Sequence, residues 1–219
     1  MRSLIHAPLA ALLLAFGAQA QSQTLEAGLA DVQSGWARAN YETQAGDARV
    51  AALDALTQRA DALVKSHPGR AEPLIWQGIV LSTYAGAKGG LGALGLAKQS
   101  RASLEAALKI DPEALQGSAY TSLGTLYYKV PGFPLGFGDK KKARQYLERA
   151  LAINPDGIDP NYFYGDFLFE QHEYAPALEH LQAALRAPAR AGRELADEGR
   201  RGEIRDLMTK IQTKLARAD

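Results

Sequence analysis

The sequence predicts an all-α fold in which antiparallel helix pairs stack into an α-solenoid, and three observations support this prediction. Alanine and leucine recur at helical spacing, and runs of β-branched residues are absent. Prolines that would stop a helix stand at 68, 112, 155 and 188, which are 44, 43 and 33 residues apart. An internal glycine recurs in the helical segment before each of the last three stops. A period of this length is typical of repeated helical hairpins.

The small residues of the repeat predict where the paired helices meet. A glycine inside a helix costs about 0.5–1 kcal/mol relative to alanine, so its recurrence indicates close packing. Gly124 and Gly165 are expected to lie where two helix backbones nearly touch, with Ala143 and Ala177 approaching from the partner helices. The repeated positions before the three later stops are Ser100, Leu104 and Ala107, then Ala143, Leu147 and Ala150, then Ala177, Leu181 and Ala184.

These positions divide residues 21–219 into a single helical domain. Its predicted parts are a divergent N-terminal helix pair (21–69), repeats at 70–112, 113–155 and 156–188, and a C-terminal capping helix at 193–217. The first two repeats are longer than the third, which predicts extended loops at 86–95 and 130–139. Insertions in a solenoid usually fall on one face, often the binding face.

The N-terminus has the three parts of a secretory signal. Arg2 provides the positive region, residues 7–16 the short apolar run, and Ala18-Gln19-Ala20 the cleavage site. We therefore expect a signal peptide at 1–20, cleaved after Ala20, and export to a bacterial periplasm. The chain has no cysteine, so we expect neither a lipoprotein nor disulfides, and no second apolar segment predicts a membrane span.

Composition and motifs argue against several classes of function. Without Arg2 the charges balance, which disfavours general nucleic-acid binding, and the basic-leaning stretch 186–217 is interpreted as a solvated helix face. The histidines at 67, 172 and 180 are expected on the surface. The latter two would lie about 12 Å apart on one helix, too far to share a metal ion. The glycine-rich segments 86–95 and 132–138 lack the order of a phosphate-binding loop. We expect no cofactor, no metal and no catalytic activity.

The segment Tyr120-x2-Leu123-Gly124-x2-Tyr127 resembles the tetratricopeptide repeat signature, and the resemblance extends over residues 70–188. This resemblance implies a right-handed superhelix whose first helices line a concave groove. Counting around the internal glycines places Ile75, Ile79, Thr121, Thr125, Tyr128, Tyr162, Asp166 and Phe169 in that groove.

The predicted groove is aromatic and apolar with one acid, and it lacks the lysine and asparagine cluster with which some repeats hold a peptide carboxylate. An apolar peptide, a helix or a partner domain fits it better. The alternative is that some of these residues pack against the terminal helix.

The connection at 131–139 is unusually apolar for a loop, and its candidate residues are Pro131, Phe133, Phe137 and Asp139. Either its apolar side chains fold back on the neighbouring helices, or they form an exposed hook for a partner; we favour packing. Asp139 is expected to cap the following helix.

This long-loop repeat also resembles the T component of TRAP transporters (the TatT-like family), through Gly138, Asp139, Lys142 and Ala143. The sequence therefore leads to two functional expectations. The first is a non-catalytic periplasmic adaptor or scaffold that binds an unidentified protein partner. The alternative, implied by the TRAP resemblance, is an accessory component of a solute-uptake system that binds a substrate-binding protein or a small ligand.

Overall fold

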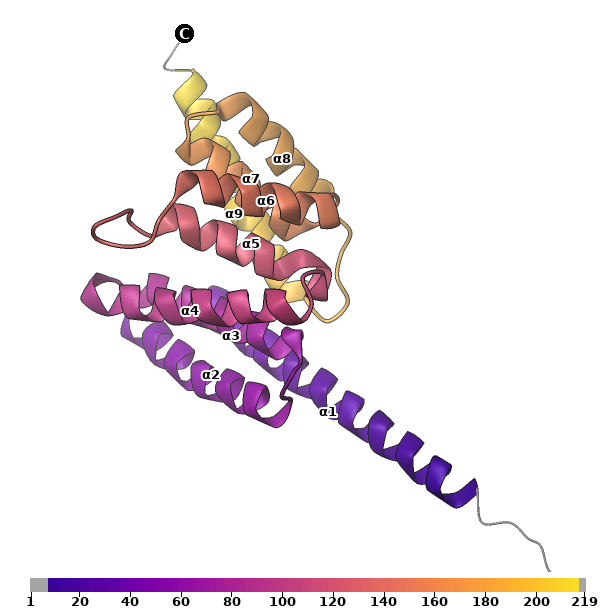
Figure 1. Cartoon of the computed structure of the whole chain (residues 1–219). Coiled ribbons are helices and arrows are strands. Elements are labelled where there is room, and N and C mark those ends of the chain that lie inside the picture. The colour runs from indigo at the N-terminus through magenta and orange to yellow at the C-terminus, as the bar shows by residue number, and fades with distance from the viewer. Residues whose placement is uncertain (1–7, 217–219) are drawn as a thin grey trace, which may run out of the picture.

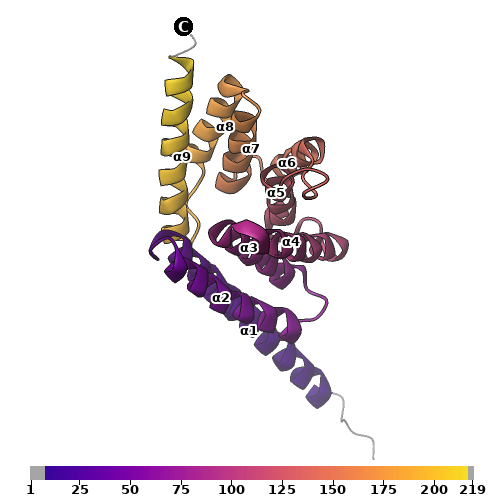
Figure 2. The same ribbon diagram turned by 90° about the vertical axis from the view of Figure 1, so that its left-hand side faces the viewer.

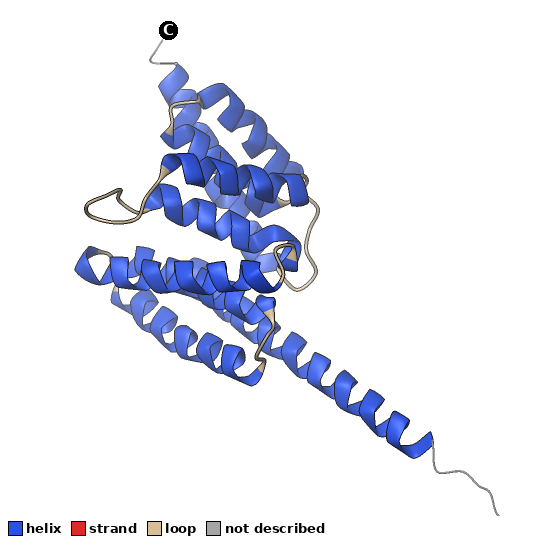
Figure 3. Cartoon of the chain, in the orientation of Figure 1, coloured by secondary structure: helices blue, strands red, loops and turns tan. Residues whose placement is uncertain are grey.

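A computed structural model describes residues 8–216, with side chains from Leu25 onward except Leu91, and the regular secondary structure of this part is entirely helical (Figure 3). The helices of the described part are α1 (Pro8–Tyr41), α2 (Asp47–Ser66), α3 (Ala71–Lys88), α4 (Gly90–Ile110), α5 (Ala114–Lys129), α6 (Lys140–Ile153), α7 (Ile158–Glu170), α8 (Tyr174–Arg186) and α9 (Glu194–Leu215). The predicted all-α class is confirmed.

The helices form consecutive antiparallel pairs that stack on one another (Figure 1). The pairs are α1/α2, α3/α4, α5/α6 and α7/α8, and the stack curves when seen from the side (Figure 2). Neighbouring first helices also contact each other, α1 with α3, α3 with α5 and α5 with α7. The arrangement is a helical-repeat solenoid.

The four prolines end the second helix of each pair, as the sequence predicts. Pro68, Pro112, Pro155 and Pro188 each stand two residues beyond the last residue of α2, α4, α6 and α8. A proline at this position cannot continue the helix, because it lacks the N–H that the next hydrogen bond requires. The chain therefore turns at each proline and enters the next pair.

The small residues lie where the helices meet, which confirms the predicted close packing. A Cβ added at Gly124 would lie 2.6 Å from Cγ of Leu147, closer than real Cβ atoms approach. The corresponding distances are 2.5 Å for Gly78 and Leu104 and 2.9 Å for Gly165 and Leu181. The facing small residues of the second helices, Ser100, Ala143 and Ala177, are fully buried.

The predicted loop at 86–95 is wrong, because α3 runs to Lys88 and α4 begins at Gly90. The extra residues of this repeat lengthen the helices, and only Gly89 lies between them. Gly89 and Gly90 have φ of 60° and 61°, a backbone region that favours glycine. The first turns of α4 pack Ala93 and Leu96 against the core. This burial offsets the poor helix propensity of the glycines.

The second predicted loop is present and has two distinct parts. At its base Phe137 packs edge-on against Tyr127, with ring centroids 5.6 Å apart, and lies under the Arg101 guanidinium at 4.3 Å. At its tip Phe133 is 93% exposed and Leu135 is 74% exposed. The favoured packed arrangement is therefore right for Phe137 and wrong for the tip, which is exposed.

Asp139 caps α6, as predicted. Its carboxylate accepts hydrogen bonds from the backbone N–H groups of Lys141 and Lys142, at 2.9 and 3.0 Å. These groups have no partner inside the helix, so the cap satisfies donors that would otherwise depend on water.

The predicted signal peptide is only partly covered by the described residues. Residues 1–7 lie outside them, and residues 8–20 form the N-terminal part of α1, which extends beyond the other helices (Figure 1). Cleavage after Ala20 stays a prediction. Across the described residues, no helix has both the length and the hydropathy needed to cross a bilayer.

Candidate functional site

The first helices of the pairs enclose a groove of about 510 Å³ on the inner side of the solenoid. Its walls come from α1, α3, α5 and α7, and the link between α8 and α9 and the first turns of α9 also contribute lining residues. The lining is mixed, with two tryptophans, small hydroxyl residues and arginines. Representative lining residues are Trp36, Trp76, Ile79, Thr121, Thr125, Asp159, Arg190, Arg193 and Arg200.

The C-terminal helix closes this groove, a role that goes beyond the predicted cap. α9 packs on α7 and α8 and also returns to α1, at the other end of the stack. The contact is close, because a Cβ added at Gly199 would lie 2.3 Å from Cδ1 of Tyr41. The groove is therefore bounded both by the repeats and by α9.

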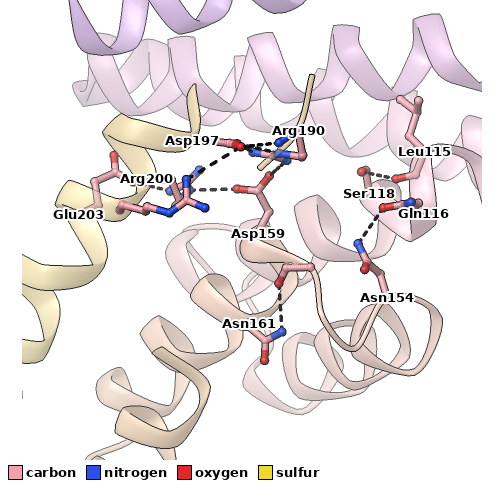
Figure 4. A network of polar contacts seen from close by, with 12 residues as sticks. Leu115, Gln116, Ser118, Asn154, Asp159, Asn161, Arg190, Asp197, Arg200 and Glu203 are labelled. Atoms are coloured by element: carbon pink, nitrogen blue, oxygen red, sulfur yellow. Dashed lines mark hydrogen bonds and ion pairs between the residues drawn. The ribbon is translucent and has the colours of Figure 1, made fainter. Parts of the chain in front are cut away.

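A network of charged side chains joins α7 to the start of α9 at the groove wall (Figure 4). Asp159 accepts hydrogen bonds from Arg190 Nη1 at 2.7 Å and from Arg200 Nε at 3.0 Å. Arg190 Nε also donates to Asp197 at 2.7 Å, and Arg200 pairs with Glu203. Each of the two arginines thus joins Asp159 to an acid on α9.

The charge of Asp159 is set by this network. Burial by itself would raise the pKa of the Asp159 carboxyl, but the Arg200 and Arg190 guanidinium groups outweigh it and lower the pKa to about 2. Asp159 therefore stays ionised at neutral pH and serves to hold the arginines. It is not placed to exchange a proton with a ligand.

Arg193 differs from its two neighbours because it forms no ion pair within the described part of the chain. Its guanidinium lies 4.9 Å from the centroid of the Trp76 ring, and burial followed by the nearby Arg190 lowers its pKa. Both Arg193 Nε and Trp76 Nε1 are buried without a hydrogen-bond partner. These two atoms themselves do not face the open groove, but the half-buried Arg193 brings to its lining a positive charge with no acid partner among the described residues, which suits an acidic group supplied by a ligand.

The groove edge also contains a strained turn at the start of α5. Leu115, Gln116 and Gly117 have φ of 49°, 55° and 75°. Positive φ is unfavourable for the first two residues, which have side chains. Gln116 is held from outside α5, because Asn154 Nδ2 donates to Gln116 Oε1 at 3.1 Å (Figure 4). Strain of this kind often occurs at binding sites.

Three residues of the predicted groove line it, namely Ile79, Thr121 and Thr125. Ile75 is instead fully buried among the core residues and does not reach the groove. The next residue of α3, Trp76, lines the groove instead. The prediction that Ile75 faces the groove is therefore wrong by one residue, because neighbouring residues of a helix point in different directions.

Tyr128 and Asp166 lie together but outside the groove lining. The Tyr128 hydroxyl donates to Asp166 Oδ2 at 2.6 Å, and the Lys129 ammonium lies 2.8 Å from the same oxygen. Burial, and then the Asp166 charge, raise the pKa of Tyr128. These contacts connect α5 to α7, so they stabilise the stacking of adjacent repeats.

Tyr162 and Phe169 also lie outside the groove lining. The ring of Tyr162 is covered by the Arg200 guanidinium at 4.3 Å, and Phe169 lies beside Tyr174, with centroids 5.9 Å apart. The first contact matches the alternative that part of the set packs against the terminal helix. A partner-binding role for these residues stays a prediction.

The histidines were expected on the surface, and this holds for His172 only. His67 is buried at 7% exposure beside Ser66, and His180 is half-buried and hydrogen-bonded to Asn161 at 3.0 Å. In the part of the chain that the structure describes, no group of three or more histidine or acidic side chains could hold a metal ion.

Sequence reasoning missed Trp36, Trp76 and the arginines of the α8–α9 link. The basic lean of residues 186–217 was the available signal, and its interpretation as a solvated helix face is wrong for Arg190 and Arg200. Arg200 is only 6% exposed. No local pattern shows that a C-terminal helix returns to the first pair.

Comparisons with known proteins identify the repeat. Residues 135–196 match the family model described as Tetratricopeptide repeat. The crystal structure of a thermophilic TPR protein in Thermus thermophilus is similar with a TM-score of 0.53 and 17% identity, covering 69% of this chain and 72% of that one. The chain contains a tetratricopeptide repeat region at residues 135–196 and has the fold of a tetratricopeptide-type helical solenoid. Repeat proteins of this type are generally non-catalytic and bind other proteins.

Two further solved structures are similar at lower TM-scores. MamA gives 0.44 with 21% identity, covering 77% of this chain and 91% of that one. The Pseudomonas aeruginosa protein pilF gives 0.37 with 14% identity, covering 91% and 93%. A search of the curated proteins returns no match for the chain.

Proposed function

We propose that this tetratricopeptide repeat protein is an adaptor that binds a segment of a partner protein in the groove between α1, α3, α5 and α7. The observation that supports this most strongly is the charge of Arg193 in the groove lining, which has no acid partner among the described residues and lies beside Trp76 and small hydroxyl residues. An extended segment offers backbone carbonyls and acidic side chains as acceptors. A volume of 510 Å³ is enough for a few side chains of such a segment.

We also propose that the protein is non-catalytic. The acid of the groove network, Asp159, is held ionised between two arginines, so it is a poor general acid or base at neutral pH. The hydroxyl of Thr125 at the groove donates to the Thr121 backbone carbonyl at 2.9 Å and has no neighbouring base among its described hydrogen-bond partners. These contacts favour binding over chemistry.

Site-specific crosslinking tests the groove. A photo-crosslinking amino acid at Thr125 is expected to capture a partner segment in the native host. The same replacement at Thr209 is a matched control. Both threonines are helical and donate to the carbonyl four residues earlier, but Thr209 is exposed on α9 and does not line the groove. Equal crosslinking from both positions, or none from Thr125, would argue against the groove as the binding site.

We further propose that the protein acts in a bacterial periplasm after removal of residues 1–20. The support is the three-part N-terminal sequence ending at Ala20. Osmotic-shock fractionation followed by intact mass measurement is expected to find a mature chain that begins at Gln21. A full-length chain recovered from the cytoplasm would contradict this location.

The alternative function is an accessory role in TRAP-type solute uptake, and Arg193 is the observation that favours it. A guanidinium in the groove lining, without an acid partner among the described residues, would also suit the carboxylate of a small organic anion. Calorimetric titration of the purified protein with small mono- and dicarboxylates separates the two functions. Saturable binding that Arg193→Gln removes would favour the uptake role, whereas binding of a partner segment alone would favour the adaptor.

A further inference from the structure

The tip of the α5–α6 loop (residues 130–139) is the most exposed apolar feature of the described chain. Phe133 is 93% exposed and Leu135 is 74% exposed, whereas the other exposed large apolar residues of the described part, Ile110 and Leu215, reach 45% and 38%. In Figure 1 this loop projects from the side of the stack, at the ends of the two helices α5 and α6 that it joins. Two large apolar side chains held in water are an unfavourable arrangement unless something covers them.

Backbone hydrogen bonds hold the base of the loop in place, and this arrangement keeps the tip exposed. The Gly138 N–H donates to the Pro131 carbonyl at 2.9 Å, and the Asp139 N–H donates to the Tyr127 carbonyl at 2.8 Å. A Cβ at Gly138 would lie only 1.9 Å from the Val130 carbonyl oxygen, so the first and last residues of the loop approach each other as closely as glycine permits. With Phe137 packed below, the tip is held away from the helices.

Positive charge follows the apolar tip directly. Lys140, Lys141 and Lys142 begin α6 and are all exposed. None of the three forms an ion pair within the described residues; Lys142 instead lies 5.5 Å from the Tyr127 ring centroid. The nearest acid in sequence, Asp139, is engaged in capping α6. The loop thus combines an apolar tip with unpaired lysines at its base.

We propose that this loop docks on an anionic lipid surface, with Phe133 and Leu135 inserted at the level of the headgroups and Lys140 and Lys141 facing lipid phosphates. Apolar side chains that enter the interface beside basic residues that remain at its surface form a typical peripheral membrane contact. A stable protein interface buries roughly 800 Å² per partner, more than two protruding side chains offer. The charge and the small apolar area therefore favour lipid over a protein surface.

Insertion is tested with a tryptophan in the loop of the full chain. Phe133→Trp is expected to give a blue-shifted emission, and quenching by brominated lipid, with vesicles of phosphatidylglycerol and phosphatidylethanolamine. Emission from the native Trp36 and Trp76 is a constant background, because both residues are buried. This readout reports the loop itself, even if the apolar residues 7–16 also bind the vesicles. Ile110→Trp, at a less exposed site on α4, is the matched control and is expected not to respond.

The lysines are tested in the Phe133→Trp background. Lys140→Gln with Lys141→Gln is expected to lower loop partitioning into the anionic vesicles roughly 30-fold, because each lysine near such a surface contributes about fivefold. Lys210→Gln with Lys214→Gln, two exposed lysines of α9, is the control and should leave the loop signal unchanged.

Three outcomes would overturn the proposal. The first is a loop signal that does not change with anionic vesicles. The second is insertion that does not depend on charge, seen either as equal insertion into phosphatidylcholine and anionic vesicles or as insertion that the Lys140→Gln and Lys141→Gln substitutions leave unchanged. The third is a concentration-dependent spectral change without vesicles, accompanied by a larger mass in solution, which would assign the tip to contact with a second copy of the chain.

Discussion

Replacing Gly124 by alanine tests whether the glycines inside the helices are required by the packing between them. Taken alone, the change should favour α5 by about 1 kcal/mol, because alanine has the better helix propensity. The added Cβ would however lie 2.6 Å from Leu147 Cγ and 3.2 Å from the Ala143 carbonyl oxygen. Overpacking of a buried contact costs about 1–3 kcal/mol, and the backbone carbonyl cannot move away as a side chain can.

Because the carbonyl cannot move, we take the upper half of this range, about 2–3 kcal/mol. After the helix-propensity gain of about 1 kcal/mol, Gly124→Ala should lower the free energy of unfolding by about 1–2 kcal/mol net. The same substitution at Gly95 is the matched control. Gly95 lies within α4, and an added Cβ there would meet no atom within 4 Å. Gly95→Ala should stabilise the protein by about 0.5–1 kcal/mol. Urea unfolding followed by circular dichroism at the helical minimum measures both variants.

A double-mutant cycle connects the loss to the named contact. Leu147→Ala is costly on its own because the side chain is fully buried. In the Gly124→Ala background it should cost at least ~1 kcal/mol less, since it also removes the clash. The reasoning would be refuted if Gly124→Ala were as stable as the unaltered chain, or if the two substitutions were simply additive.

Three further predictions concern polar contacts. Asp139→Ala removes the cap of α6 and should cost about 1 kcal/mol in urea unfolding, whereas Asp139→Asn should retain most of it. Because the pKa of Asp159 is about 2 in the folded protein and 3.8 ordinarily, its pairing with Arg190 and Arg200 stabilises the fold fully above about pH 4. That contribution, roughly 2 kcal/mol, should be lost as the pH falls toward 2, and an Asp159→Asn variant should lack this part of the pH dependence. Tyr128→Phe removes a 2.6 Å hydrogen bond and should cost about 1–2 kcal/mol by thermal or urea unfolding, with no change in helix content.

Much of this fold could be predicted from the sequence, because its signals are local. Proline ends a helix through its own missing N–H, so Pro112 and Pro155 mark boundaries wherever they occur in such a chain. Gly124 and Ala143 mark a close approach of two helices that follow each other directly. Asp139 caps α6 by accepting from N–H groups that are at most three residues further along the chain. In each case the interacting groups are near neighbours along the chain or belong to one hairpin.

The tertiary structure decided the features that depend on distant contacts. Most of 86–95 is helical although its glycines are poor helix formers, and packing of Ala93 and Leu96 against the core offsets that poor propensity. The groove lining brings together Arg193 and Trp76, which are far apart in sequence and meet because α9 returns to α1, the neighbour of α3. Local propensity describes how each segment folds, whereas burial and charge pairing between remote segments determine which side chains face the groove.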